Sequence, residues 1–357
     1  MTRSCWLAGV TSMLFMGCVQ PDPTNPWSTK AQSVDSVMVI SEPTTEVILA
    51  RPLEPTPLSR HDNAIAVLRR AVSAEHPLLR ATAFEGLQGE PDLFELLAPS
   101  GLTDENRGVR FVTAMSVAEV GSERLAPLLE PLLLDDSMSV QAAAIFALHQ
   151  LGENVDLTPL ATCVMEPSPE VRANTYIVLG RLGNPSAISL IDASLQQDLR
   201  RVNLMRLRMA ELQGASALVQ LGREDMVEPI RAALFAPPEQ AERTLLACDL
   251  LGELHDEGAK PMLVRILSAS GDQERPLEVR IAAAKALLQL DAPQPEGLLR
   301  VLFRGLADDD PRRRLQAATA LATAEGPEVE SALLSLVDDP DPMVAIIAAG
   351  AIIASDS

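Results

Sequence analysis

Recurrent arginines and short runs of acidic residues are the side chains of this sequence that are best placed to do chemistry. A row of guanidinium groups could bind an anion, because arginine donates to oxygen atoms through a planar fork. The acids beside each arginine favour a structural role, in which it bonds the acid or the backbone carbonyls of a turn, its own or a neighbour's. The arginines in question are Arg80, Arg110, Arg172, Arg280 and Arg314.

Two acid runs could be imagined as calcium sites, Asp308-Asp309-Asp310 and Asp338-Asp339-x-Asp341. Neither run has the alternating acids, the glycine and the distal glutamate of a calcium loop. Acids at the start of a helix accept hydrogen bonds from its free N–H groups. We therefore interpret both runs as helix starts, and the sequence predicts no metal site.

Motifs for catalysis are missing from the sequence. The four histidines do not cluster, and there is no G-x-S-x-G, P-loop, H-E-x-x-H or C-x-x-C motif. The net charge of −20 repels phosphate backbones, which argues against a nucleic-acid partner. We therefore predict no catalytic residue, no cofactor and no nucleic acid, and we expect that the chain is not an enzyme.

The first residues, MTRSCWLAGVTSMLFMGCVQPDP, have the form of a signal peptide. Arg3 precedes an apolar run from Trp6 to Met16, which is too short to span a hydrocarbon core about 30 Å thick. We expect residues 1–17 to be the signal peptide of an exported protein.

The end of this segment, Leu14-Phe15-Met16-Gly17-Cys18, resembles the lipobox of bacterial lipoproteins. The small residue and the cysteine match that motif, whereas Phe15 and Met16 depart from it. The resemblance implies lipidation of Cys18, and the following Val19 implies sorting to the outer membrane, facing the periplasm. The alternative is ordinary signal-peptide cleavage beside an incidental cysteine. Residues 18–60 are rich in Pro, Thr and Ser, which predicts a largely disordered tether.

A unit of 30 to 39 residues recurs through residues 61–357. Small or apolar residues follow an anchor dipeptide at offsets of 4, 7, 8 and 11, which trace one face of a helix. A trailing glycine is typical of the left-handed residue that ends a helix, as at Gly152, Gly183, Gly222 and Gly252. The anchors are Leu79-Arg80, Val109-Arg110, Val140-Gln141, Val171-Arg172, Ala210-Glu211, Gln240-Ala241, Val279-Arg280, Arg313-Arg314 and Met343-Val344.

These units resemble HEAT repeats of the short type first associated with phycobilisome lyases, in which an acidic turn is followed by Val-Arg, Ala-Leu and Leu-Gly. The resemblance implies an all-α fold, a right-handed α-solenoid (superhelix) of about nine helical hairpins whose second helices line the concave side. Deoxyhypusine hydroxylases, which share such repeats, bind iron through paired His-Glu steps. This chain has no His-Glu step, so that iron site is not carried over.

A spacing of 39 residues before Ala210-Glu211 interrupts the repeat and predicts a helix that extends backwards through DLRRVNLMRLRMAEL. Arginine and methionine are enriched at protein interfaces, so this stretch is a candidate partner-binding patch. The alternative is a long core helix whose arginines pair with local acids such as Asp198 and Glu211. The other irregular insertion, residues 268–276, is expected to be a loop. The residues of the candidate patch are Arg200, Arg201, Arg206 and Arg208.

The function that we expect from these features is a non-catalytic scaffold of the bacterial cell envelope. It would be held to the membrane by its lipid anchor alone and would bind protein partners on its concave face. The alternative is an accessory or regulatory subunit, chaperone-like, of an envelope enzyme complex. A deep pocket with buried polar groups among the second helices would favour the alternative, and a broad shallow groove would favour the scaffold.

Overall fold

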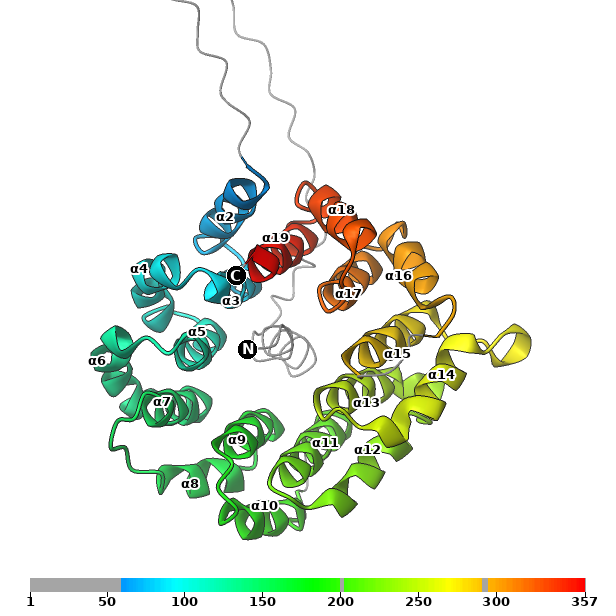
Figure 1. Cartoon of the computed structure of the whole chain (residues 1–357). Coiled ribbons are helices and arrows are strands. Elements are labelled where there is room, and N and C mark those ends of the chain that lie inside the picture. Colours follow the sequence, from blue (N-terminus) through cyan, green and yellow to red (C-terminus); the bar gives the residue numbers. More distant parts are fainter. Residues whose placement is uncertain (1–58, 200–201, 291–294, 357) are drawn as a thin grey trace, which may run out of the picture.

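The computed structural model describes residues 59–356, apart from 200–201 and 291–294, and all regular elements in this part are helices. They form nine successive pairs, in which the first helix lies on the outside of a ring and the second on the inside (Figure 1). The fold class, an all-α solenoid of helical hairpins, is thereby confirmed. The outer helices are α2 (Arg60–Ala71), α4 (Pro91–Leu102), α6 (Ala126–Leu129), α8 (Pro159–Met165), α10 (Ala187–Leu195), α12 (Val227–Ala233), α14 (Lys260–Ser268), α16 (Leu298–Leu306) and α18 (Pro327–Leu336). The inner helices are α3 (Pro77–Gly86), α5 (Arg107–Val120), α7 (Met138–Gln150), α9 (Pro169–Leu182), α11 (Leu204–Gln220), α13 (Ala241–Glu253), α15 (Leu277–Gln289), α17 (Pro311–Leu321) and α19 (Pro342–Asp356).

The two ends of the solenoid meet, so that the pairs close into a ring, which the repeat pattern did not predict. The last helix, α19, packs against α2 and α3, as Figure 1 shows for the red helix beside the blue and cyan ones. Arg60 of α2 pairs with Glu330 of α18 across the same seam. Gly86 and Gly350 allow a close approach there, because a Cβ at Gly86 would lie 3.5 Å from the Cα of Gly350.

The sequence of α19 explains this closure. Every residue from 343 to 353 is buried, and none of them is polar. The terminal unit of an open solenoid needs a polar outer face to remain soluble. An apolar last helix of this kind is stable only when a further surface covers it, and here the first pair provides that surface.

The predicted helical face is confirmed by the packing between neighbouring inner helices. In α7 the residues at offsets 0, 4, 7 and 8 are Val140, Ala144, Ala147 and Leu148, and all four are buried. The alanines allow adjacent helices to approach closely, which agrees with the low content of aromatic residues.

Side chains and glycines mark the ends of the helices. The Asn106 side chain accepts a hydrogen bond from the N–H of Gly108 at 2.8 Å at the start of α5. Gly152, Gly183 and Gly222 have the predicted positive φ, with values of 82°, 65° and 99°. The prediction is wrong for Gly252, which lies inside α13, because the left-handed position is taken by His255.

Three irregular segments differ in how well the sequence predicted them. The outer segment over residues 123–134 is divided into α6 and two flanking 3-10 turns, and a proline stands near the start of α6 and of the second turn. Helix α11 is the longest inner helix described, but it begins at Leu204 behind an Asn203 cap rather than at Asp198. The insertion at 268–276 is a loop with one 3-10 turn, as predicted.

The expected signal peptide, Cys18 and most of the tether lie outside the described residues, since the description begins at Ser59. Within the described part, the helices are too short or too polar to cross a membrane.

Candidate functional site

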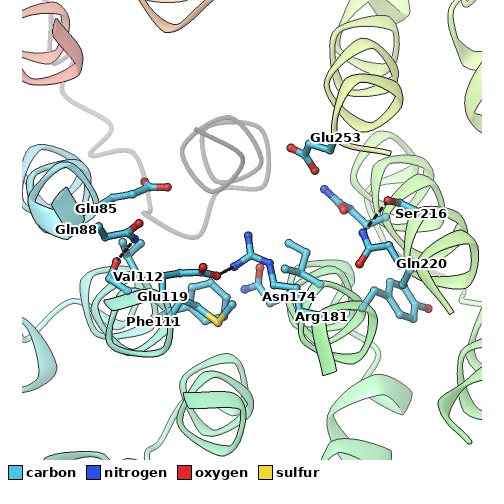
Figure 2. Close-up of a pocket in the computed structure, with 16 residues that line it drawn as sticks. Glu85, Gln88, Phe111, Val112, Glu119, Asn174, Arg181, Ser216, Gln220 and Glu253 are labelled. Atoms are coloured by element: carbon cyan, nitrogen blue, oxygen red, sulfur yellow. Dashed lines mark hydrogen bonds and ion pairs between the residues drawn. The ribbon is translucent and has the colours of Figure 1, made fainter. Parts of the chain in front are cut away.

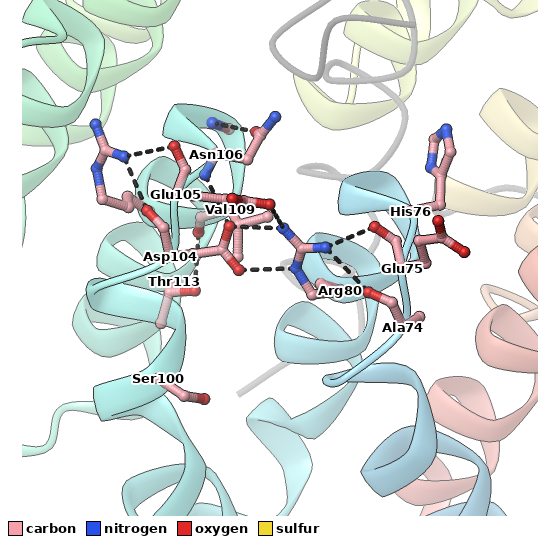
Figure 3. Close-up of polar contacts among 12 residues, drawn as sticks. Ala74, Glu75, His76, Arg80, Ser100, Asp104, Glu105, Asn106, Val109 and Thr113 are labelled. Carbon is pink, nitrogen blue, oxygen red and sulfur yellow. Dashed lines mark hydrogen bonds and ion pairs between the residues drawn. The ribbon is translucent and has the colours of Figure 1, made fainter. Parts of the chain in front are cut away.

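The recurrent arginines hold neighbouring pairs together, as the structural interpretation predicted. Arg80 donates to both carboxylate oxygens of Asp104 at 2.7 Å and to the carbonyl oxygens of Ala74 and Glu75 at 3.0 and 2.8 Å (Figure 3). Arg110 repeats this arrangement with Asp135, and Arg314 repeats it with Asp339. In these three arginines the guanidinium therefore joins the turn of its own pair to the turn of the next. Arg280 differs, because it pairs with Glu274 of its own loop and its Nε atom has no hydrogen-bond partner.

The acid runs also have the predicted structural role. The Asp310 side chain accepts from the N–H of Arg312 at 3.0 Å, and the Asp341 side chain accepts from the N–H of Met343 at 2.9 Å. Both acids therefore cap the start of an inner helix. Across the described residues, no group of three or more His, Cys, Asp and Glu side chains could hold a metal ion.

The candidate patch of arginines is only partly described, because Arg200 and Arg201 lie outside the described residues. Arg206 and Arg208 are exposed in the first turns of α11. Arg208 pairs with Glu211 at 2.8 Å, and the charge of Arg206 acts on the half-buried Glu170 at the start of α9. The two arginines thus have local acidic neighbours and remain accessible, so a partner-binding role stays a prediction.

A hollow on the inner wall brings together polar side chains that the sequence analysis did not single out. It has a volume of about 60 Å³ and is bordered by α3, α5, α9, α11 and α13. In Figure 2 the carboxylates of Glu85 and Glu253 point into it from opposite sides. Arg181 of α9 pairs with Glu119 of α5 at 2.9 Å, although α7 lies between these two helices. The polar residues that line the hollow are Glu85, Gln88, Ser116, Glu119, Asn174, Arg181, Gln213, Ser216, Gln220 and Glu253.

Glu253 has the most unusual environment in this hollow. Its side chain is partly exposed, but its Oε1 atom is enclosed and accepts no hydrogen bond. Burial, together with the nearby charge of Asp249, raises the pKa of Glu253 to about 7, although Lys285 and Arg181 oppose the shift. Glu253 is therefore a carboxyl group that changes its charge near neutral pH.

A second hollow, of about 430 Å³, lies on the inner wall between α13, α15 and α17. Its apolar lining includes Leu245, Ile281 and Leu315. Asp249 and Lys285 also line it, and the Lys285 Nζ lies 3.0 Å from the Asp249 Oδ1. Both side chains are almost fully buried, and burial raises the pKa of Asp249. A volume of this size is typical of a ligand pocket.

These inner-wall charges were missed because they do not recur at the same position from one repeat to the next. One signal was present in the sequence: Asp249 and Glu253 are spaced by four, which places them on one face of a helix, roughly opposite to the face that carries the small residues. Charged residues are rarely buried without a partner or a function. Two acids one turn apart, on the side of α13 away from the repeat's packed face, could therefore have identified the inner wall.

Comparison with known proteins identifies the repeats. A family model of HEAT repeats matches residues 65–149. No curated protein matches the chain. Among solved structures, the chain is similar to human deoxyhypusine hydroxylase in complex with glycerol, with 19% sequence identity, a TM-score of 0.36, and coverage of 76% of this chain and 97% of that one.

The prediction that the chain is not an enzyme is contradicted by this likeness. The structure in question is named as that of a hydroxylase, which is an enzyme. The likeness concerns the fold and transfers no activity to this chain. The match at residues 65–149 and the helical pairs support a HEAT-like repeat protein.

Proposed function

We propose that this chain is a protein-interaction scaffold of the bacterial cell envelope that binds a segment of its partner within the ring. HEAT repeats in general mediate protein–protein contacts. One observation supports a binding site within the ring, namely the polar inner wall. There the buried Asp249–Lys285 pair and the unpartnered Glu253 Oε1 lie among apolar helices. Buried polar groups are ordinarily satisfied, and binding would supply the missing partner.

The alternative role, an accessory subunit of an envelope enzyme complex, is favoured by one specific feature of the ring. We expected a broad shallow groove for a plain scaffold and a pocket with buried polar groups for an accessory factor. The hollow of about 430 Å³ with Asp249 and Lys285 in its lining is the second kind of site. In this form of the proposal, the ring holds one defined segment of the partner rather than a broad surface.

The proposal also includes export and lipidation of Cys18, which would hold the ring near the outer membrane through the tether of residues 18–60. Support for this part comes from the sequence of the first residues, in which Gly17-Cys18 follows an apolar run. Labelling with radioactive palmitate tests it, with Cys18→Ser as the control. An unlabelled wild-type protein would remove the lipid anchor from the proposal.

Site-specific photo-crosslinking in living cells tests the binding function itself. One crosslinking residue replaces Gln220, which lines the inner hollow, and a control replaces Leu96, which is exposed on the outer helix α4. We expect one protein species to be crosslinked from position 220 and not from position 96. The same species from both positions, or no species from position 220, contradicts binding within the ring.

A further inference from the structure

We propose that Glu253 is the anchor for one cationic group, a lysine ammonium or an arginine guanidinium, on the partner segment that enters the ring. This inference rests on the proposed function, since it assumes that the inner wall is the binding surface. It adds the chemistry that the wall recognises and the residue that recognises it.

The first observation is that the Glu253 carboxylate lacks the donor that an enclosed acceptor requires. Its Oε1 atom is enclosed and has no hydrogen-bond partner. The two cations that act on Glu253 already pair with other acids. Arg181 pairs with Glu119 at 2.9 Å, and Lys285 pairs with Asp249 at 3.0 Å. A buried acceptor without a donor is costly, so a ligand that donates to it gains binding energy.

The second observation is the balance of charge along this part of the inner wall. Among the described residues that line the first hollow or act on the pKa of Glu253, four are acids and two, Arg181 and Lys285, are cations. An excess of negative charge in a confined space attracts a cation and repels an anion. The acids are Glu85, Glu119, Asp249 and Glu253.

The third observation is the size of the hollow beside Glu253. Its volume of about 60 Å³ has room for roughly four water molecules, at about 15 Å³ for each. This space admits the head group of a side chain, whereas pockets for larger free ligands start at about 300 Å³. The occupant that fits is therefore the charged end of a lysine or an arginine on a longer segment.

The titration of Glu253 makes the binding of a cation depend on pH, and this dependence can be measured. The groups that face it and act on its pKa are Asp249 one turn earlier on α13, Lys285 on α15 and Arg181 on α9. Because burial raises the pKa of Glu253 to about 7, the carboxylate that attracts a cation forms mainly above neutral pH. Binding of a cation through Glu253 therefore strengthens as the pH rises.

The experiment uses the full chain and three blocked tripeptides, glycyl-lysyl-glycine, glycyl-arginyl-glycine and the same lysine peptide acetylated on its ammonium group. Binding is measured by calorimetry at about pH 6 and about pH 8. For a pKa of about 7, the affinity of the bound peptide rises about tenfold between these values. The tighter of the lysine and arginine peptides identifies the cationic group that the site prefers.

The test variant is Glu253→Gln, which keeps the shape of the side chain, and the matched control is Glu239→Gln on an exposed residue. We expect Glu253→Gln to lose at least tenfold in affinity and to lose the pH dependence, and we expect Glu239→Gln to behave as the wild type. Equal binding by Glu253→Gln, equal binding of the acetylated peptide, or no binding of either cationic peptide overturns the inference.

The two proposals fail in different ways. A partner that is crosslinked from position 220 equally well in wild type and in Glu253→Gln leaves the proposed function standing and removes Glu253 as its anchor. Absence of any crosslink from position 220 contradicts the proposed function, whereas the peptides report on the cation site alone.

Discussion

The ammonium group of Lys285 lies 3.0 Å from the carboxylate of Asp249, and both side chains are almost entirely excluded from solvent. This pair joins α15 to α13 on the inner wall, where most neighbouring contacts are made by alanine and leucine. Burial of two charges costs free energy that their attraction offsets only when the geometry is good. The ring therefore retains two charged side chains in its inner wall although their burial costs free energy.

Removal of one partner of this pair is expected to be far more harmful than removal of both. Lys285→Ala leaves the buried Asp249 carboxylate without its ammonium group, so we expect a loss of about 3–5 kcal/mol in the free energy of unfolding. The double variant Asp249→Leu with Lys285→Met replaces both charges with apolar side chains and should come within about 1 kcal/mol of wild type or exceed it. Urea unfolding followed by circular dichroism compares the three proteins. A double variant as unstable as Lys285→Ala would contradict this account.

Glu253 is expected to destabilise the ring at high pH. Its pKa rises from 4.5 in the unfolded chain to about 7 in the folded one, so the folded chain holds the proton more tightly. The stability that this group contributes is complete below about pH 4.5 and is lost as the pH rises through about 7. Relative to wild type, Glu253→Gln should gain up to about 3 kcal/mol at pH 8 and nothing at pH 4. Thermal unfolding at both pH values measures the difference, and a gain that does not depend on pH would rule out the titration.

The arginines between pairs should contribute to stability in proportion to their burial. Arg110 is mostly buried and bonds Asp135 through two of its nitrogens at 2.8 Å, so Arg110→Ala should cost about 2–4 kcal/mol. Arg124 bonds Glu95 at 3.1 Å from an exposed position, so Arg124→Ala should change the stability by less than about 1 kcal/mol. Denaturant midpoints of both variants provide the measurement. Similar losses in the two variants would show that burial does not decide the contribution.

Closure of the ring can be tested with a disulfide across the seam. Gly86 and Gly350 approach closely enough that a Cβ at Gly86 would lie 3.5 Å from the Cα of Gly350. A chain with Gly86→Cys and Gly350→Cys should therefore form an intramolecular disulfide on mild oxidation, which gives faster migration on a non-reducing gel. Gly86→Cys with Gly121→Cys is the control, since Gly121 ends α5 with open space around it. Failure of the first pair to crosslink in the folded protein would argue for an open solenoid.

The exposed arginines of α11 provide a separate test of partner binding. Arg206→Glu with Arg208→Glu reverses two charges on a surface that is otherwise acidic, and Arg208 pairs with the exposed side of Glu211. We expect the double variant to fold normally and to lose the partner that is crosslinked from position 220, if that partner also contacts this edge of the ring. An unchanged crosslink would remove these arginines from the binding surface.

The repeat and the role of its arginines were predictable from the sequence, because the same residue pattern occurs in several copies and each copy supports the same interpretation. The face of Val140, Ala144 and Leu148 recurs in other copies, and Arg80, Arg110 and Arg314 all follow acidic turns. Closure could also have been suspected, because the run from Met343 to Ile353 has no polar residue for an exposed end.

The inner-wall site could not be predicted in the same way, because its residues come from different copies and do not recur. Glu85, Arg181 and Glu253 belong to α3, α9 and α13, and only the curvature of the ring brings them to one hollow. Curvature depends on small differences in packing between successive pairs, which a repeat pattern does not record. The start of α11 was misplaced for a related reason, since the Asn203 cap and not the spacing of apolar residues determines it.

The seam between α19 and the first pair also changes how the molecule loses its structure. An open row of nine pairs has eight interfaces and two free ends, from which unfolding can begin by fraying. Closure adds a ninth interface and removes both ends, so the release of any pair requires both of its interfaces to break. The last of these contacts joins residues that are nearly the whole described chain apart, and its formation must wait until most of the other pairs are in place. We expect the ring to unfold as a single cooperative unit.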